Sequence, residues 1–433
     1  MITPLSANKP LYGCLPFGFL LLLALSLTAG SANAEQTLTL TEAIQLATQN
    51  QPLLQSLDDA ATSSRQAAIA EGQLPDPKVK FGVINLPVTT SDAFNVNRDD
   101  QTAVNIGISQ DMIPLKKREA AANRMKAEAD QFHTEQIATA RTIERDVALA
   151  WLDAFEAQRK SELYQRIMNE MAAEQKVLIS RVSSGGAQTS EVLRLDSQLS
   201  MTTDKRLTAQ RDERKARAAL ARWIGSASSR SISSELPVMT NSLNRDAAVT
   251  GIENHPMLQN AHQTEKVAQL DADRAQADLQ RNWSWEVGYG KRFADRSDML
   301  SFQVAIDLQL DRANRQDRRT AEKLVLVEKA RKLTEDKRRE LSAELDGALA
   351  DAEAAEARDN EHQSRLIPNA QARLSLAQAA YTAGKQPLSE VWLARRDLLD
   401  VELDHWAILT DRQRAAVKID YFLNGNRLFK EHQ

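Results

Sequence analysis

Histidine is the residue type here that is best suited to metal binding, and the chain has six: His133, His255, His262, His362, His405 and His432. They are scattered along the sequence. His255 and His262 could share one helix face, but they lack the adjacent carboxylate–histidine spacing typical of a metal site. A nucleophile motif, a phosphate-binding loop and a dinucleotide fingerprint are also missing. We therefore expect no enzyme activity, no metal site and no cofactor.

Aromatic residues alternate with polar and small residues where the sequence reads WSWEVGYG, at residues 283–290. Trp283, Trp285 and Tyr289 fall on one side of this period-two pattern, which predicts a strand with one apolar and one polar face. A second alternating segment follows at residues 301–310. Both are about as long as a strand that crosses a bilayer at a tilt. Aromatic residues at such positions mark a membrane interface; packing beneath another element is the alternative.

Two further alternating segments, residues 79–86 and 103–109, enclose a polar loop, so the chain offers four strands. A membrane barrel needs at least eight strands, and four would leave two open edges that lipid does not tolerate. The barrel must therefore be shared between copies of the chain. Because a barrel of eight strands is filled by its own side chains, a conducting pore requires at least three copies.

Long helices are predicted between and after the strands. Residues 116–180 contain neither proline nor glycine, and at about 1.5 Å per residue they predict a helix of roughly 100 Å. This length favours a coiled-coil-like body. A helix returns after the break at Gly185, and the pattern recurs around Gly384. Such helices can form a solid stalk or a hollow cylinder, and the polar faces of the strands favour the hollow form.

The sequence contains an internal duplication. The segment NQPLL at residues 50–54 matches NHPML at 254–258, and the SEV tripeptides that follow Gly185 and Gly384 match each other. Both matches lie at an offset of about 200 residues. Each unit reads as helix, strand, strand, long helix, break and returning helix. The predicted repeats are residues 35–243 and 244–433.

The first 34 residues have the pattern of a secretory signal peptide. Lys9 is the only charged side chain before residue 35, an apolar run follows at 15–29, and Ala-Asn-Ala at 32–34 fits a cleavage site. An uncleaved membrane anchor is the alternative. Cys14, the only cysteine, precedes the apolar run, so we expect neither a lipid anchor nor disulfides in the mature chain. No transmembrane helix is expected after residue 34.

The composition excludes some function classes. Charged residues make up 26% of the chain and aromatic residues 5%, which suits long helices packed on small residues rather than a thick globular core. The formal net charge is −4, and no basic stripe occurs. Nucleic acid is therefore not an expected partner.

Several segments give the chain a resemblance to a known family. These are LTEAIQLATQNQPLL, the hairpin ends VSSGGAQTSEVLRLDSQL and YTAGKQPLSEVWLARRDLLDVE, and the paired strands. Over about residues 38–425 the chain resembles the TolC-like outer-membrane efflux channels of Gram-negative bacteria. LPDPKVKFGVINLP followed by ISQDMIPLKKREAA is similar to the heavy-metal cation (CzcC-like) branch, although Lys116-Lys117-Arg118 stands where Gly-Lys-Arg is more usual.

The resemblance implies a homotrimer with a 12-stranded barrel in outer-membrane lipid and a long α-helical tunnel in the periplasm. The tunnel tip would dock a periplasmic adaptor bound to an inner-membrane pump, of the resistance-nodulation-division type. The channel would passively conduct heavy-metal cations. The alternatives are a drug or organic-compound duct of the same family and a periplasmic coiled-coil adaptor or scaffold.

The resemblance also suggests functional residues at the hairpin ends. Glu390 falls where the family has an acidic ring in the pore constriction, which would concentrate cations; an ordinary solvated carboxylate is the alternative. Tyr381 matches a tyrosine that helps hold the constriction shut, and Glu191 matches its acidic partner region. Gly185 and Gly384 would form the periplasmic tip, as turns, adaptor contacts or both.

Two positions depart from the family pattern. Leu393 replaces a second acidic residue, and Gln386 replaces the usual arginine near the tip. The constriction must therefore be held differently. Arg395 and Arg396 could supply the missing charge, or they could be ordinary exposed helix residues.

Overall fold

The computed structural model describes residues 37–49, 51–237 and 245–423. The predicted signal peptide lies outside the described residues. So does Cys14, on which the expectation of no lipid anchor depends. His432 lies outside them as well. None of the described helices has both the length and the apolar character needed to cross a membrane.

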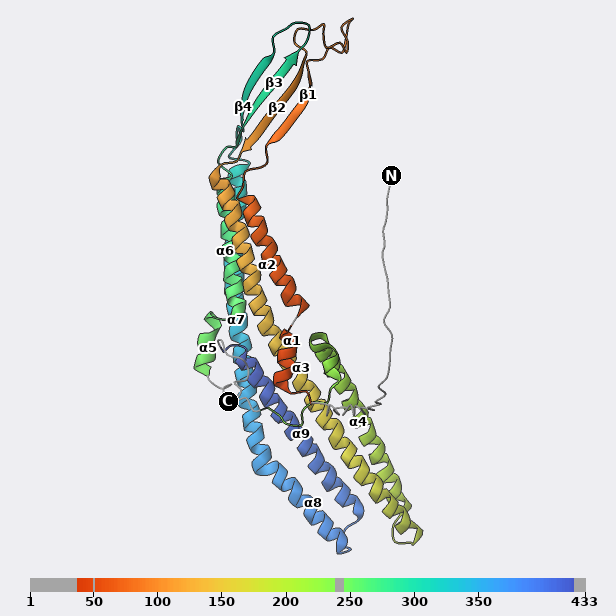
Figure 1. Ribbon diagram of the computed structural model, residues 1–433. Helices are drawn as coiled ribbons and strands as arrows, with labels where there is room; N and C mark the ends of the chain where they lie inside the picture. The colour runs from red at the N-terminus through yellow and green to blue at the C-terminus, as the bar shows by residue number, and fades with distance from the viewer. Residues whose placement is uncertain (1–36, 50, 238–244, 424–433) are drawn as a thin grey trace, which may run out of the picture. The chain divides into compact units, whose positions relative to one another are not determined.

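The prediction of a mainly helical chain with four strands is confirmed (Figure 1). A 3-10 turn, η1, covers Gly225–Ser229, and a π-helical turn, η2, covers His362–Leu366. The helices are α1 Leu40–Thr48, α2 Pro52–Glu71, α3 Leu115–Ser183, α4 Thr189–Ile224, α5 Arg245–Glu253, α6 Pro256–Ala277, α7 Gln316–Glu361, α8 Ile367–Thr382 and α9 Leu388–Asp420.

The element order of the first half of the chain recurs in the second half. Both α2 and α6 begin at a proline, where the missing N–H needs no partner. Each is followed by two strands, a long helix, a glycine turn and a returning helix. The long helix of the second half is interrupted by η2, just before Pro368, whereas Gly347 lies inside α7 without breaking it.

The four strands form one antiparallel sheet in the order β1-β2-β3-β4. They cover Lys78–Ile84, Ala103–Met112, Trp283–Arg292 and Met299–Ile306. The prediction that the last strand runs to residue 310 is wrong. Ile306 pairs with Trp283, the first residue of β3. One more backbone hydrogen bond follows, from the Asp307 N–H to the Asn282 carbonyl at 3.0 Å, and the paired strand then ends.

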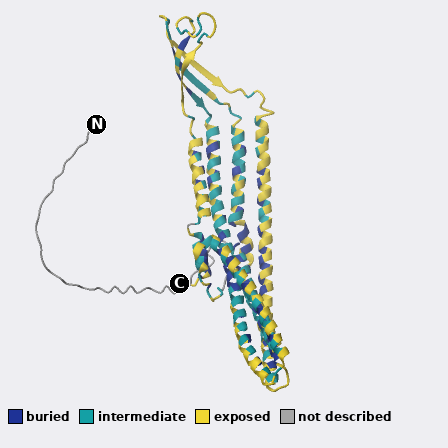
Figure 2. Ribbon diagram, turned by 90° about the vertical axis from the view of Figure 1, so that its right-hand side faces the viewer, coloured by how far each residue is buried: buried dark blue, intermediate teal, exposed yellow. Residues whose placement is uncertain are grey.

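The register places most of the apolar side chains of the four strands on one face. Ile108 of β2, for example, lies between Val79 of β1 and Val287 of β3. The opposite face carries mainly polar and small residues, and Lys80 forms an ion pair there with Glu286. The outer strands β1 and β4 each pair on one side only and are exposed along their whole length (Figure 2).

The helical core is built mainly around α3, which packs against α2, α4, α6 and α9. Trp151 of α3 is fully buried, stacks on Phe155 with ring centroids 5.6 Å apart, and donates its Nε1–H to the Leu38 carbonyl at 3.0 Å. The hydrogen bond holds Leu38, near the beginning of the described residues, against α3. A second cluster joins α5, α6, α7 and the end of α9 around Leu258 and Phe422.

Candidate functional site

The two glycine turns have the same backbone geometry. Gly185, after α3, has φ +76°, and Gly384, after α8, has φ +69°. In each turn the N–H of the residue after the glycine donates to a carbonyl five residues back: Gly186 to Arg181 at 2.8 Å and Lys385 to Ala380 at 2.9 Å. This is the Schellman ending of a helix, which favours glycine in the left-handed conformation.

The two hairpins, α3–α4 and α8–α9, share one apolar cluster close to these turns. The members from α3 and α4 pack against members from α8 and α9, so the hairpin ends are in contact. The buried members are Met171, Leu178, Leu195, Ala377, Leu388, Val391 and Ala394.

A polar contact also links the two hairpins. The guanidinium of Arg181, at the end of α3, donates a hydrogen bond to the hydroxyl of Tyr381, at the end of α8. Its Cζ lies 5.4 Å from the centroid of the tyrosine ring. Tyr381 is thus in contact with an arginine, but not with one of the arginines singled out from the sequence.

Arg181 was missed because nothing in its sequence surroundings points across to the other repeat. The only available signal was its place in the last turn of a helix, where a basic residue is favoured by the helix dipole. Arg395, one of the sequence candidates, instead pairs with Glu170 of α3 at 3.1 Å. Arg396 pairs with its neighbour Asp397 at 3.4 Å.

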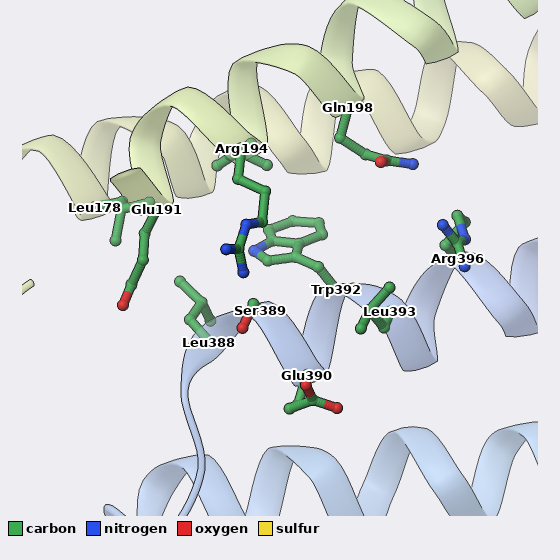
Figure 3. Close-up of a pocket in the computed structure, with 11 residues that line it drawn as sticks. Leu178, Glu191, Arg194, Gln198, Leu388, Ser389, Glu390, Trp392, Leu393 and Arg396 are labelled. Atoms are coloured by element: carbon green, nitrogen blue, oxygen red, sulfur yellow. The ribbon is translucent and has the colours of Figure 1, made fainter. Parts of the chain in front are cut away.

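Glu191 and Glu390 line the same small cavity of about 110 Å³ between α4 and α9 (Figure 3). Each lies in the first turn of its helix, where the dipole favours a carboxylate. Figure 3 shows Glu390 on the side of α9 away from Trp392 and Arg194. Among the described residues, neither carboxylate forms an ion pair. The cavity is completed by Leu178, Arg194, Leu195, Gln198, Leu388, Ser389, Trp392, Leu393 and Arg396.

The three aromatic residues singled out from the sequence all lie in β3. Trp283, Trp285 and Tyr289 share the apolar face of the sheet, and Trp283 stands at the strand end that follows α6. Trp283 and Tyr289 are exposed, and Trp285 is half-buried. The Tyr289 hydroxyl donates to Asp298 in the β3–β4 turn.

A buried group of titratable residues lies away from the tip, where α9 ends. Burial lowers the pKa of His255 to about 4, and the side chain is only 1% exposed. Burial also raises the pKa of Asp420 to about 6, although Arg141, whose Nη2 lies 3.7 Å from its Oδ2, opposes this shift. In the described part of the chain, no group of three or more potential ligands could hold a metal ion.

No protein-family model matches the chain, and no curated protein matches it by sequence. Solved structures do match it. CusC, described as forming a transmembrane channel, is 15% identical with a TM-score of 0.74, over 89% of this chain and 92% of that one. The CmeC outer membrane channel of Campylobacter jejuni is 10% identical with a TM-score of 0.75, over 89% of this chain and 85% of that one.

The outer membrane protein VceC of Vibrio cholerae is also similar. It is 17% identical with a TM-score of 0.71, and the match covers 89% of this chain and 94% of that one. Because these sequence identities are low, the comparisons show a similarity of fold alone. The chain therefore has the fold of these outer-membrane proteins over most of its length.

Proposed function

We propose that the protein is the outer-membrane channel of a tripartite efflux system and acts as a passive, trimeric duct. The observation that carries this proposal is the exposed apolar face of the four-stranded sheet. Phe81 of β1 is 87% exposed, and Leu300 and Phe302 of β4 are 78% and 69% exposed. A continuous apolar surface of this kind is suited to lipid, and the similarity to solved outer-membrane channels supports the same placement.

The internal duplication suggests how the copies join. Within the chain, β2 of the first repeat pairs with β3 of the second. The equivalent pairing for the free edges is β4 of one copy with β1 of the next. Likewise α3 of the first repeat packs on α6 of the second within the chain. Because α7 corresponds to α3 and α2 corresponds to α6, α7 would pack on α2 of the next copy. Repeating this pairing from copy to copy would close a ring, and three copies would give 12 strands.

The hairpin ends would form the gate and the docking tip. The Arg181–Tyr381 contact joins the two hairpins of one copy and would oppose their separation. Exposed Glu390 would face its two counterparts in the trimer, where three carboxylates attract cations. Gly185 and Gly384, at the outermost turns, would contact a periplasmic adaptor bound to an inner-membrane pump of the resistance-nodulation-division type.

Heavy-metal cations are the proposed substrate. Support comes from the sequence LPDPKVKFGVINLP, which contains β1, and from the position of Glu390. Drugs or other organic compounds are the alternative, because the pump and the adaptor choose the substrate in such an assembly. Sensitivity of a deletion strain to metal salts but not to drugs would support the first choice, and the reverse result would contradict it.

The membrane placement can be tested with two matched phenylalanines. Phe81 lies on the apolar face of β1, and Phe94, which is 74% exposed, lies in the β1–β2 loop. Arginine on the lipid face costs about 2–4 kcal/mol at the centre of the bilayer. Phe81→Arg should therefore sharply reduce the amount of protein in the outer membrane, whereas Phe94→Arg should not. Equal amounts of both variants, or release of the wild-type chain as soluble protein, would overturn the proposal.

A further inference from the structure

The π turn η2 divides the long helix of the second repeat, whereas α3, its counterpart in the first repeat, is continuous from Leu115 to Ser183 (Figure 1). At the turn the Ile367 N–H donates to the His362 carbonyl, five residues back. In an α-helix this bond reaches four residues back, so a π turn takes up one residue more. The buried positions of the two repeats show where the second repeat has this extra residue.

Before the turn, the buried positions of α7 repeat those of α3 at a spacing of 198 residues. Seven of the ten buried residues of α7 have a buried counterpart at this spacing, and the other three have a half-buried one. At a spacing of 199 residues, one of these ten has a buried counterpart. The seven matches are Ala129 with Val327, Ile143 with Leu341, Val147 with Leu345, Ala150 with Ala348, Trp151 with Leu349, Ala154 with Ala352 and Ala157 with Ala355.

Beyond the turn the spacing is 199 residues. Ala370 corresponds to Met171 and Ala377 corresponds to Leu178, and all four side chains are buried. At a spacing of 198 residues, neither alanine of α8 has a buried counterpart. The two glycine turns also lie 199 residues apart. The second repeat therefore has one added residue between Ala355 and Ala370, the interval that contains η2.

Contacts with α9 hold the turn in place. The ring of buried His362 lies beside that of His405, with centroids 6.0 Å apart and an angle of 14° between the planes. Gln363 Nε2 donates to the Asp359 carboxylate at 2.8 Å, and the same carboxylate lies 2.9 Å from His405 Nε2. Pro368, which follows the turn, has no N–H and would disturb an uninterrupted α-helix at this point. The sequence around η2 thus favours a local departure from the α-helix.

We infer that η2 absorbs one added residue and so keeps α8 in the rotation in which Tyr381 reaches Arg181. One residue corresponds to about 100° of rotation in an α-helix. Without the π turn, the added residue would carry Ala377 out of the apolar cluster at the hairpin ends and would turn Tyr381 away from Arg181. The rotation of α8 does not rest on the proposed function, whereas its importance for the proposed gate does.

Deleting one residue tests the inference, because a helix that has lost the added residue needs no π turn. The deletion removes Ser364, which is exposed and donates to the Asn360 carbonyl of its own helix. The variant also carries Pro368→Ala, since the proline would disrupt the continuous helix that results. The matched insertion variant carries Pro368→Ala and one additional alanine after Ser364. Pro368→Ala alone is the reference protein.

Single cysteines in α8 report its rotation. Cys14 is the only cysteine of the chain and is replaced, and the rate of modification by a water-soluble maleimide is then measured in the intact protein. Ala377 is 9% exposed, whereas Leu376 and Gln378 are exposed. In the reference protein Ala377→Cys should therefore react more slowly than Leu376→Cys and Gln378→Cys.

The deletion should leave Ala377→Cys the slowest of the three, because the π turn becomes an α turn and the rotation of α8 is kept. The insertion should end the protection of Ala377→Cys and move it to Leu376→Cys, because a second added residue turns α8 by a further 100° or so. The inference is overturned if Gln378→Cys becomes the slowest in the deletion variant, if all three react there at one rate, or if the insertion leaves the order unchanged.

These rates separate the inference from the proposed function. They report the rotation of α8 whether or not the protein conducts, and single-channel recording tests the channel. A conducting protein with the wrong order of rates contradicts only the role of η2. A protein that does not conduct but shows the expected order supports the role of η2 and contradicts the channel.

Discussion

The contact between Arg181 and Tyr381 allows a quantitative prediction about the proposed gate. Tyr381→Phe removes the hydroxyl that accepts the arginine hydrogen bond but keeps the ring that packs beside the guanidinium. Arg181 is exposed and Tyr381 is half-buried, so we take a net value of about 1 kcal/mol for this hydrogen bond. If three copies open together, the closed state loses about 3 kcal/mol, which is about a 100-fold change in the ratio of open to closed channels.

Single-channel recording in planar bilayers measures this ratio. We expect Tyr381→Phe to raise the open fraction and Arg181→Ala to raise it further, because the second variant also removes the cation–π contact. Tyr164→Phe is the matched control, since no hydrogen bond of the Tyr164 hydroxyl is found among the described residues. An open fraction that stays at the wild-type value in both tip variants would refute the role of this contact.

Three further predictions concern the turns, the carboxylate at the tip and the buried aspartate. Gly384→Ala should lower the free energy of unfolding by about 1–2 kcal/mol because the φ of Gly384 is +69°. Gly347→Ala, inside α7 with open space around it, should raise the free energy of unfolding by about 0.5–1 kcal/mol. Equal effects of the two substitutions in denaturant titrations would contradict the turn geometry. Glu390→Ala should weaken block of the channel by divalent cations, and unchanged block would remove Glu390 from the constriction. The Asp420 pKa is raised from 3.8 to about 6, so the folded state favours the protonated carboxyl. Above pH 6 the ionised carboxylate therefore lowers the free energy of unfolding by up to about 3 kcal/mol. Asp420→Asn should therefore stabilise the protein at pH 8 and lose its advantage towards pH 4; an advantage that is equal at both pH values would refute this explanation.

The elements could be predicted from the sequence because their periodicities are local. Alternation at residues 283–290 specifies a strand wherever its partner lies, and the stretch without glycine or proline specifies α3. The end of β4 could not be predicted in this way. Leu308 and Leu310 continue the alternation, but the strand ends at Ile306 because β3 begins at Trp283.

The tip residues show the same limit. Gly185 and Gly384 were found from the sequence because a left-handed turn leaves a local signal. Arg181 and Tyr381 are 200 residues apart in sequence and meet only because the two repeats fold side by side. The pair of His362 and His405 was overlooked for a similar reason, since a π turn and a returning helix bring them together.

The number of copies in the assembled protein tests the central claim most directly. The sheet of one chain has two unpaired edges, β1 and β4, and the proposed ring closes with three chains. Native mass spectrometry of the protein extracted from the outer membrane should give a mass three times that of the mature chain. A stable monomer or dimer that still conducts would contradict the account.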